Sequence, residues 1–257
     1  MEEVCALKAR IIFSKTGSMK FIGHLDVMRF FQKAFRRAEV DIAYSQGFNR
    51  HQLMSFAQPL GVGLTSDGEY LDVELNTCDS SDEMVARINE KMNEEMRVVE
   101  FKLLGDKARN AMSIVAGADY QIHLKDGYAP VTDFEERFTQ FLSQEVIEIE
   151  KKTKKSSSIV DIKPFIYQYA FSKNEFEKKV NRDYQNSVAQ TYETDQKVYL
   201  QVSTGSVHNL MPDLVMEAFY QYIGEEYKEF AWQYHRYDLY AAGEAEGTLV
   251  SLGDLKD

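Results

Sequence analysis

Three side chains near the start of the sequence could together transfer a proton. His24 and Asp26 lie on either side of Leu25, where a helix is predicted to begin, and His51 follows in a turn after that helix. Histidine is the side chain most easily tuned to exchange protons near neutral pH, so convergence of the three would make an acid and base set. Their spacing matches no catalytic template. Asp26 also has a simpler interpretation, as an acceptor for the free N–H groups at the helix start.

The same three side chains are candidate metal ligands, but their spacing argues against a metal. A pair of histidines four residues apart would place both rings on one helical face, and the five histidines include no such pair. The remaining histidines, His123, His208 and His235, are scattered and are expected to be structural. We therefore expect no metal and no cofactor.

Positive charge gathers on one side of the helix that begins near Leu25. At about 100° per residue, apolar side chains fall on one side of this helix and cations on the other. The apolar set is Val27, Met28, Phe30, Phe31, Ala34, Phe35 and Ala38, and the cationic set, called the cationic face below, is Arg29, Lys33, Arg36 and Arg37. Such a face is typical of an ordinary solvated helix surface, and it also suits a phosphate or another anion.

A turn-prone run after this helix mixes aromatic, amide and cationic side chains. This aromatic turn, residues 44–51, has the sequence YSQGFNRH. Unpaired bases stack on aromatic rings, while amide and guanidinium groups bind base edges and phosphates. The candidate RNA or anion site therefore combines the cationic face with residues of the turn, namely Tyr44, Gln46, Phe48, Asn49 and Arg50.

The apolar pattern of the first half predicts strand, helix, two strands, helix and strand, which is the order of a ferredoxin-like unit. The predicted strands are residues 9–13, 40–44, 53–64, 70–75 and 98–104, with a short extended piece at 20–22 and a hairpin turn at 66–68. The second predicted helix carries an apolar stripe of Met84, Ile88, Met92 and Met96. The first domain is therefore expected at residues 1–105.

The second half roughly repeats this order. Strands are predicted at residues 120–124, 146–150, 159–171, 198–203 and 229–239, and helices at 131–142 and 212–223. The polar segment 172–196 is expected to be an exposed loop or extended hairpin. We predict an α+β protein of two tandem ferredoxin-like units with antiparallel sheets covered by helices. The second domain is expected at 118–241, with a flexible tail at 242–257.

Composition and charge limit the classes of function. The chain has 257 residues, 44% of them hydrophobic, and a formal net charge of −11. Such a charge argues against a general nucleic-acid coat, and no DNA binding is expected. Residues 1–60 nevertheless carry nine cations against five acids, whereas residues 61–100 carry three against eleven, so a localised anion site is compatible with the overall charge. The sequence shows neither a signal peptide nor a membrane-spanning apolar run, and we expect a cytoplasmic protein.

Several runs of the sequence resemble a known family. They are FIGHLDVMRFFQKAFRRAEVDIAYSQGFN, SFAQPLGVGLTSDGEYLDVEL and, further along, KKSSSIVDIKPFI. The resemblance is to the radical-SAM-linked protein family, an uncharacterised domain of unknown function found beside, or fused behind, a radical SAM enzyme. Arg50 and Gln52 flank His51 where the family pattern usually has prolines. The resemblance implies a radical SAM partner and an association with RNA processing, but no activity of the chain's own. Only two cysteines are present, fewer than the three that a radical SAM cluster needs.

Three hypotheses follow from these observations. The preferred one is an accessory protein without catalytic activity that binds RNA, for example tRNA or rRNA, and works with a radical SAM enzyme in RNA modification or processing. The second is an RNA-modifying or RNA-cleaving enzyme that uses His24, Asp26 and His51, an analogy at the level of fold. The third is a protein-interaction module in which a hairpin at residues 61–74 docks the radical SAM partner.

Overall fold

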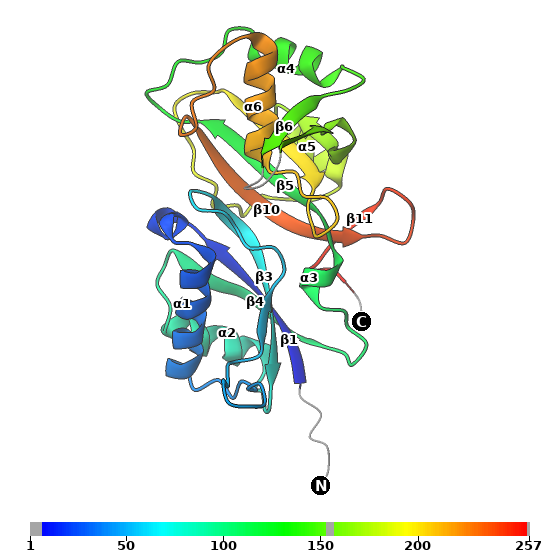
Figure 1. Cartoon of the computed structure of the whole chain (residues 1–257). Helices are drawn as coiled ribbons and strands as arrows, with labels where there is room; N and C mark the ends of the chain where they lie inside the picture. The colour runs from blue at the N-terminus through cyan, green and yellow to red at the C-terminus, as the bar shows by residue number, and fades with distance from the viewer. Residues whose placement is uncertain (1–6, 153–156, 256–257) are drawn as a thin grey trace. The chain divides into compact units, whose positions relative to one another are not determined.

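The chain folds into two compact units. A computed structural model describes residues 7–152 and 157–255 (Figure 1). Unit 1 comprises the residues up to Ala116 together with those from Asp238 onward, and unit 2 comprises the residues from Gly117 to Tyr237. Compared with the domains expected from the sequence, unit 1 also includes the junction after residue 105 and the end of the chain.

Unit 1 is built on an antiparallel sheet with the strand order β4-β1-β3-β2. Its strands are β1 (Leu7–Lys15), β2 (Met54–Phe56), β3 (Thr65–Leu75) and β4 (Met96–Leu104), and its two longer helices are α1 (His24–Arg37) and α2 (Ser81–Glu90). The order along the chain, β1-α1-β2-β3-α2-β4, is that of a ferredoxin-like unit. The predicted α+β fold is confirmed.

Helices α1 and α2 cover one face of this sheet, as Figure 1 shows. Most of the apolar stripe of α1 is buried, and Phe31 and Phe35 have no exposed surface. They pack against the strand residues that point to the same face, including Ile11 of β1 and Leu71 of β3. The core of unit 1 therefore follows the 3.6-residue and 2-residue periods in the sequence.

Several details of unit 1 differ from the sequence-based expectations. Helix α2 ends at Glu90, so Met92 and Met96 of the predicted apolar stripe lie outside it, and Met96 begins β4. Residues Gly17–Phe21 form a 3-10 helix instead of an extended piece. The strand expected at residues 40–44 is reduced to isolated bridges of Ile42 and Tyr44, and the strand expected at 53–64 is limited to β2. The turn predicted at residues 66–68 is wrong, because these residues belong to β3.

The segment at residues 66–68 holds an irregularity of the ladder between β1 and β3. Phe13 pairs with Glu69 and Lys15 pairs with Ser66. Between these two pairings β3 advances by three residues, whereas β1 advances by two. An extra residue of this kind is a β-bulge, and glycine in a strand, here Gly68, often marks one.

Unit 2 has the same ferredoxin-like strand order, β10-β5-β9-β8. Its strands are β5 (Val115–Leu124, of which the first two residues belong to unit 1), β8 (Ile166–Ala170), β9 (Lys197–Ser203) and β10 (Trp232–Ala242, which enters unit 1 at Asp238). Its helices are α4 (Phe134–Leu142), α5 (Lys173–Val180) and α6 (Pro212–Ile223), with a 3-10 turn at Lys163–Phe165 and a separate hairpin of β6 (Glu148–Lys152) and β7 (Ser157–Asp161).

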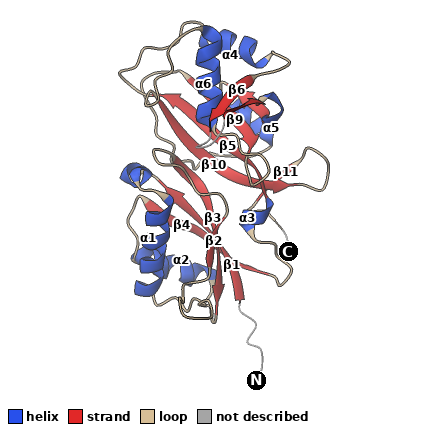
Figure 2. Ribbon diagram, in the orientation of Figure 1, coloured by secondary structure: helices blue, strands red, loops and turns tan. Residues whose placement is uncertain are grey.

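The core of unit 2 is aromatic. Phe138 of α4 lies 4.9 Å from Phe219 of α6 between ring centroids, and these two helices lie close together in Figure 2. Phe134 stacks on Trp232 at the start of β10. The exposed loop predicted at residues 172–196 is wrong in part, because it contains α5, whose Phe176 is fully buried.

The second face of the sheet in unit 1 is covered by short segments from the junction and the chain end. They include helix α3 (Ala111–Ile114) and strand β11 (Leu249–Ser251), which pairs with the end of β10. The tail expected to be flexible therefore contains a strand. Leu252 donates its N–H to the carbonyl oxygen of Leu239 at 3.0 Å and is buried, which holds this segment on unit 1.

Candidate functional site

The cationic face of α1 is exposed to solvent along its length. Arg29 forms an ion pair of 3.1 Å with Asp26, and because both side chains are more than 60% exposed, this pair holds Arg29 only weakly. Arg37 donates to the carbonyl oxygen of Lys91 at 2.6 Å. Lys33 and Arg36 have no side-chain partner among residues 7–152 and 157–255. At least two cations of the face are therefore available to an anion.

The aromatic turn is a closed loop with an exposed tip. Ser45 and His51 join its two sides, with the Ser45 N–H donating to the His51 carbonyl oxygen at 2.9 Å. The guanidinium of Arg50 lies 5.9 Å from the centre of the Tyr44 ring, within the range of a cation–π contact. Phe48 at the tip is fully exposed, next to Gly47, whose φ of +100° gives the chain its sharp reversal.

The base of the turn is tied to the end of β3. Leu53 donates its N–H to the carbonyl oxygen of Ala43 at 2.9 Å, and Ala43 in turn donates to that of Glu74 at 2.8 Å. The N–H of Glu74 donates to the carbonyl oxygen of Leu53 at 3.1 Å. These backbone bonds fix the position of the turn, so its exposed rings are presented on a rigid support.

Of the predicted acid and base set, only His24 and Asp26 lie on one element. The His24 ring packs edge-on against Phe56 at 5.0 Å, and partial burial lowers the pKa of His24. The Nδ1 atom of His51 instead lies 2.9 Å from the hydroxyl oxygen of Ser45 and 3.1 Å from the carbonyl oxygen of Asn49. The structure therefore gives the two histidines separate surroundings.

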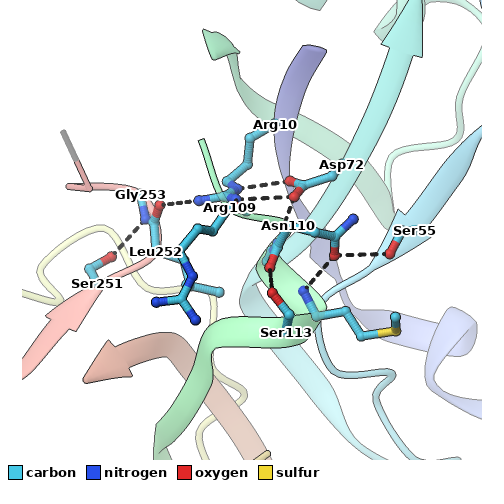
Figure 3. A network of polar contacts seen from close by, with 11 residues as sticks. Arg10, Ser55, Asp72, Arg109, Asn110, Ser113, Ser251, Leu252 and Gly253 are labelled. Atoms are coloured by element: carbon cyan, nitrogen blue, oxygen red, sulfur yellow. Dashed lines mark hydrogen bonds and ion pairs between the residues drawn. The ribbon is translucent and has the colours of Figure 1, made fainter. Parts of the chain in front are cut away.

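A buried polar network on the second face of the sheet was not predicted from the sequence. Arg10 of β1 and Asp72 of β3 are register partners and form an ion pair of 2.8 Å (Figure 3). Arg10 also donates to the carbonyl oxygens of Arg109 and Leu252, and Asp72 accepts the N–H of Ala111 at 2.7 Å. The only hint in the sequence is that the polar residues of β3 alternate with its apolar ones.

Neither a metal centre nor a membrane span emerges from the described part of the chain. No group of three or more His, Cys, Asp or Glu side chains there is arranged to hold a metal ion. The helices of residues 7–152 and 157–255 are all too short or too polar to cross a bilayer. The cationic face and the aromatic turn are both exposed, and together they present charges, rings and amides of the kind that can bind a polyanion.

Comparison with known proteins places the chain in a family. No curated protein matches the sequence. A family model described as an uncharacterized protein conserved in bacteria, DUF2344, matches residues 8–212, which include most of both units. The chain therefore belongs to the DUF2344 family of uncharacterised bacterial proteins.

Proposed function

We propose that the protein is an accessory RNA-binding protein that holds single-stranded or looped RNA on unit 1. The observation that carries this proposal is the pairing of free cations with an exposed ring. Lys33 and Arg36 have no side-chain partner in the described part of the chain, and Phe48 is fully exposed on the aromatic turn. Only residues 38–43 separate the end of α1 from that turn.

The charges of the cationic face support binding to phosphates. A protein with a net charge of −11 repels polyanions over most of its surface, so a local group of four cations sets the orientation in which RNA can approach. Each cation that contacts a phosphate releases a counterion, which supplies sequence-independent affinity. Arg29 can exchange its exposed partner Asp26 for a phosphate at little cost.

The aromatic turn supports binding to unpaired bases. A base can stack on Phe48, while Gln46 and Asn49 are exposed beside it and carry amide groups that can bond base edges. Arg50, which lies over the Tyr44 ring, offers a flat guanidinium for stacking or for a phosphate. Double-stranded RNA would leave these rings unused, because its bases are already stacked on one another.

The proposed partner is a radical SAM enzyme, for which the bound RNA is the substrate. The support for this part is the resemblance of residues 21–49 and 55–75 to proteins found beside such enzymes. Phe21, Leu25 and Val62 offer a surface for this docking, because each is at least 60% exposed. The N–H of Gly63 bonds to the carbonyl oxygen of Lys20 at 2.7 Å, which holds the two segments together.

Crosslinking in cells tests the RNA proposal. The tagged protein is crosslinked by ultraviolet light, and the attached RNA is recovered and sequenced, in parallel with a Lys33→Glu/Arg36→Glu variant. The expected result is one enriched RNA class for the unchanged protein and its loss in the variant. Equal recovery from both proteins would overturn the proposal.

Co-purification from nuclease-treated extract tests the partner. If a radical SAM enzyme remains bound without RNA, and Leu25→Glu releases it, the docking surface is supported. Retention of RNA without any such enzyme would leave RNA binding standing and remove the partner.

A further inference from the structure

Unit 1 also has a pocket of about 340 Å³ beside the buried polar network, and its lining shares no residue with the cationic face. Arg10, Lys107 and Arg109 contribute cations to its lining, Ser113 contributes a hydroxyl, and Ile114 and Leu255 are among its apolar residues. None of the described residues that line it is acidic. In a chain with 41 acidic residues, a pocket whose lining has cations and no acid suits a ligand of negative charge.

The segment that carries Lys107 and Arg109 is held in place by the Arg10–Asp72 ion pair. Arg10 donates to the carbonyl oxygen of Arg109 at 3.0 Å, and Asp72 accepts the N–H of Ala111 at 2.7 Å. Asn110, between these two anchors, accepts the N–H of Met112 at 2.9 Å through its side chain. The ion pair beneath the pocket thus holds the backbone on both sides of Asn110, so a ligand would meet a preorganised segment.

The charges available to a ligand are those of Lys107 and Arg109. The charge of Arg10 is balanced by Asp72, and its donors already bond to Asp72, Leu252 and Arg109. The side chains of Lys107 and Arg109 are exposed and have no partner in the described part of the chain. Figure 3 shows the Arg109 side chain extending away from Asp72. The pocket therefore offers two uncompensated positive charges, which match a phosphate dianion.

We infer that this pocket binds a small phosphate monoester, with the phosphate on Arg109 and Lys107 and the organic part against the apolar wall. Arginine binds two phosphate oxygens at once through its planar fork, and lysine adds a point charge. The hydroxyl of Ser113, which donates to the carbonyl oxygen of Asn110 at 2.7 Å, keeps lone pairs that can accept from the ligand. The pocket volume lies at the lower end of the range for small-molecule sites.

Titration calorimetry with the full-length protein tests this inference. The probes are AMP, inorganic phosphate and adenosine. We expect AMP to bind more tightly than either of the others, because only AMP carries both the phosphate and an organic part. Absence of AMP and phosphate binding at millimolar concentration would overturn the inference, as would equal affinity for AMP and adenosine. Equal affinity for AMP and phosphate would remove the role of the apolar wall.

Substitutions locate the binding to this pocket. Arg109→Gln and Lys107→Gln each remove one exposed charge, and each should weaken AMP binding by about tenfold or more. Thermal unfolding should be unchanged, because neither side chain has a partner in the described part. The matched control is Lys33→Gln on the cationic face, which should leave AMP affinity as it is. Equal AMP affinity in Arg109→Gln and the unchanged protein would contradict the assigned site, whatever the outcome for RNA.

Discussion

Arg10 and Asp72 face each other on neighbouring strands and are joined by two hydrogen bonds, from Nε to Oδ1 at 2.8 Å and from Nη2 to Oδ2 at 3.0 Å. Both residues are more than 90% buried. Through Arg109, Ala111 and Leu252 the same pair also holds the junction after β4 and the end of the chain. One ion pair thus anchors both the junction segment and the chain-end segment on the second face of the sheet in unit 1.

Arg10→Met should destabilise the protein strongly. The substitution leaves the Asp72 carboxylate buried without its partner, and breaking a buried pair in this way costs about 3–5 kcal/mol. Urea unfolding measures the change. The matched control is Lys8→Met on the same strand, which removes an exposed cation and should change the free energy of unfolding by less than about 0.5 kcal/mol. Equal stability of the two variants would contradict the structural role of the pair.

Phe48→Ala should weaken RNA binding and leave stability unchanged. Stacking of one base on an aromatic side chain contributes about 1–3 kcal/mol, so the dissociation constant for single-stranded RNA should rise roughly 5- to 150-fold. Phe230→Ala in unit 2 removes another exposed ring and serves as the control. If the two variants bind RNA equally well, the aromatic turn does not stack a base.

The start of α2 should respond to acid. Ser80 and Glu83 form a capping box, and the hydrogen bonds from the Ser80 hydroxyl and N–H lower the pKa of Glu83. Because the folded-state pKa is depressed, the stabilisation is present above the unfolded-state pKa and is lost as the pH falls through the folded value. In Ser80→Ala the pKa of Glu83, followed by NMR, should rise toward its ordinary value. An unchanged titration would show that the serine hydroxyl does not act on Glu83.

The sequence predicts well those elements whose signal is local. The apolar stripe that contains Phe31 and Phe35 predicts α1, and the alternation at residues 70–75 predicts β3, because both patterns follow from the period of a single element. The sequence does not predict α5 within residues 172–196, because the composition of this segment is polar. Two of its rings, Phe176 and Tyr184, are buried and anchor it, and Tyr184 stacks on Tyr237 at 4.2 Å.

The two candidate sites differ in the same respect, because only one of them has a local signal in the sequence. The cationic face could be predicted, because helical periodicity places Lys33 and Arg36 on the side opposite the core. The pocket beside Arg109 could not, because it depends on Arg10 meeting Asp72, 62 residues further along the chain. The contact between Arg10 and Asp72 is set by strand register. The segments that cover this ion pair have the composition of a junction and a loose tail.

The most direct test of RNA binding by the cationic face is the salt dependence of that binding. The affinity of purified protein for a fluorescent single-stranded RNA is measured from low to physiological salt, for the unchanged protein, for Lys33→Glu/Arg36→Glu and for the control Lys178→Glu/Lys228→Glu. The control reverses two exposed cations of unit 2 and changes the net charge equally.

If the face contacts RNA phosphates, the Lys33→Glu/Arg36→Glu variant should bind more weakly than the control at every salt concentration. The slope of log affinity against log salt should become shallower by about 0.7 for each lost phosphate contact, about 1.4 for both. Equal affinities and slopes for the two variants, or no binding by the unchanged protein at low salt, would contradict the account.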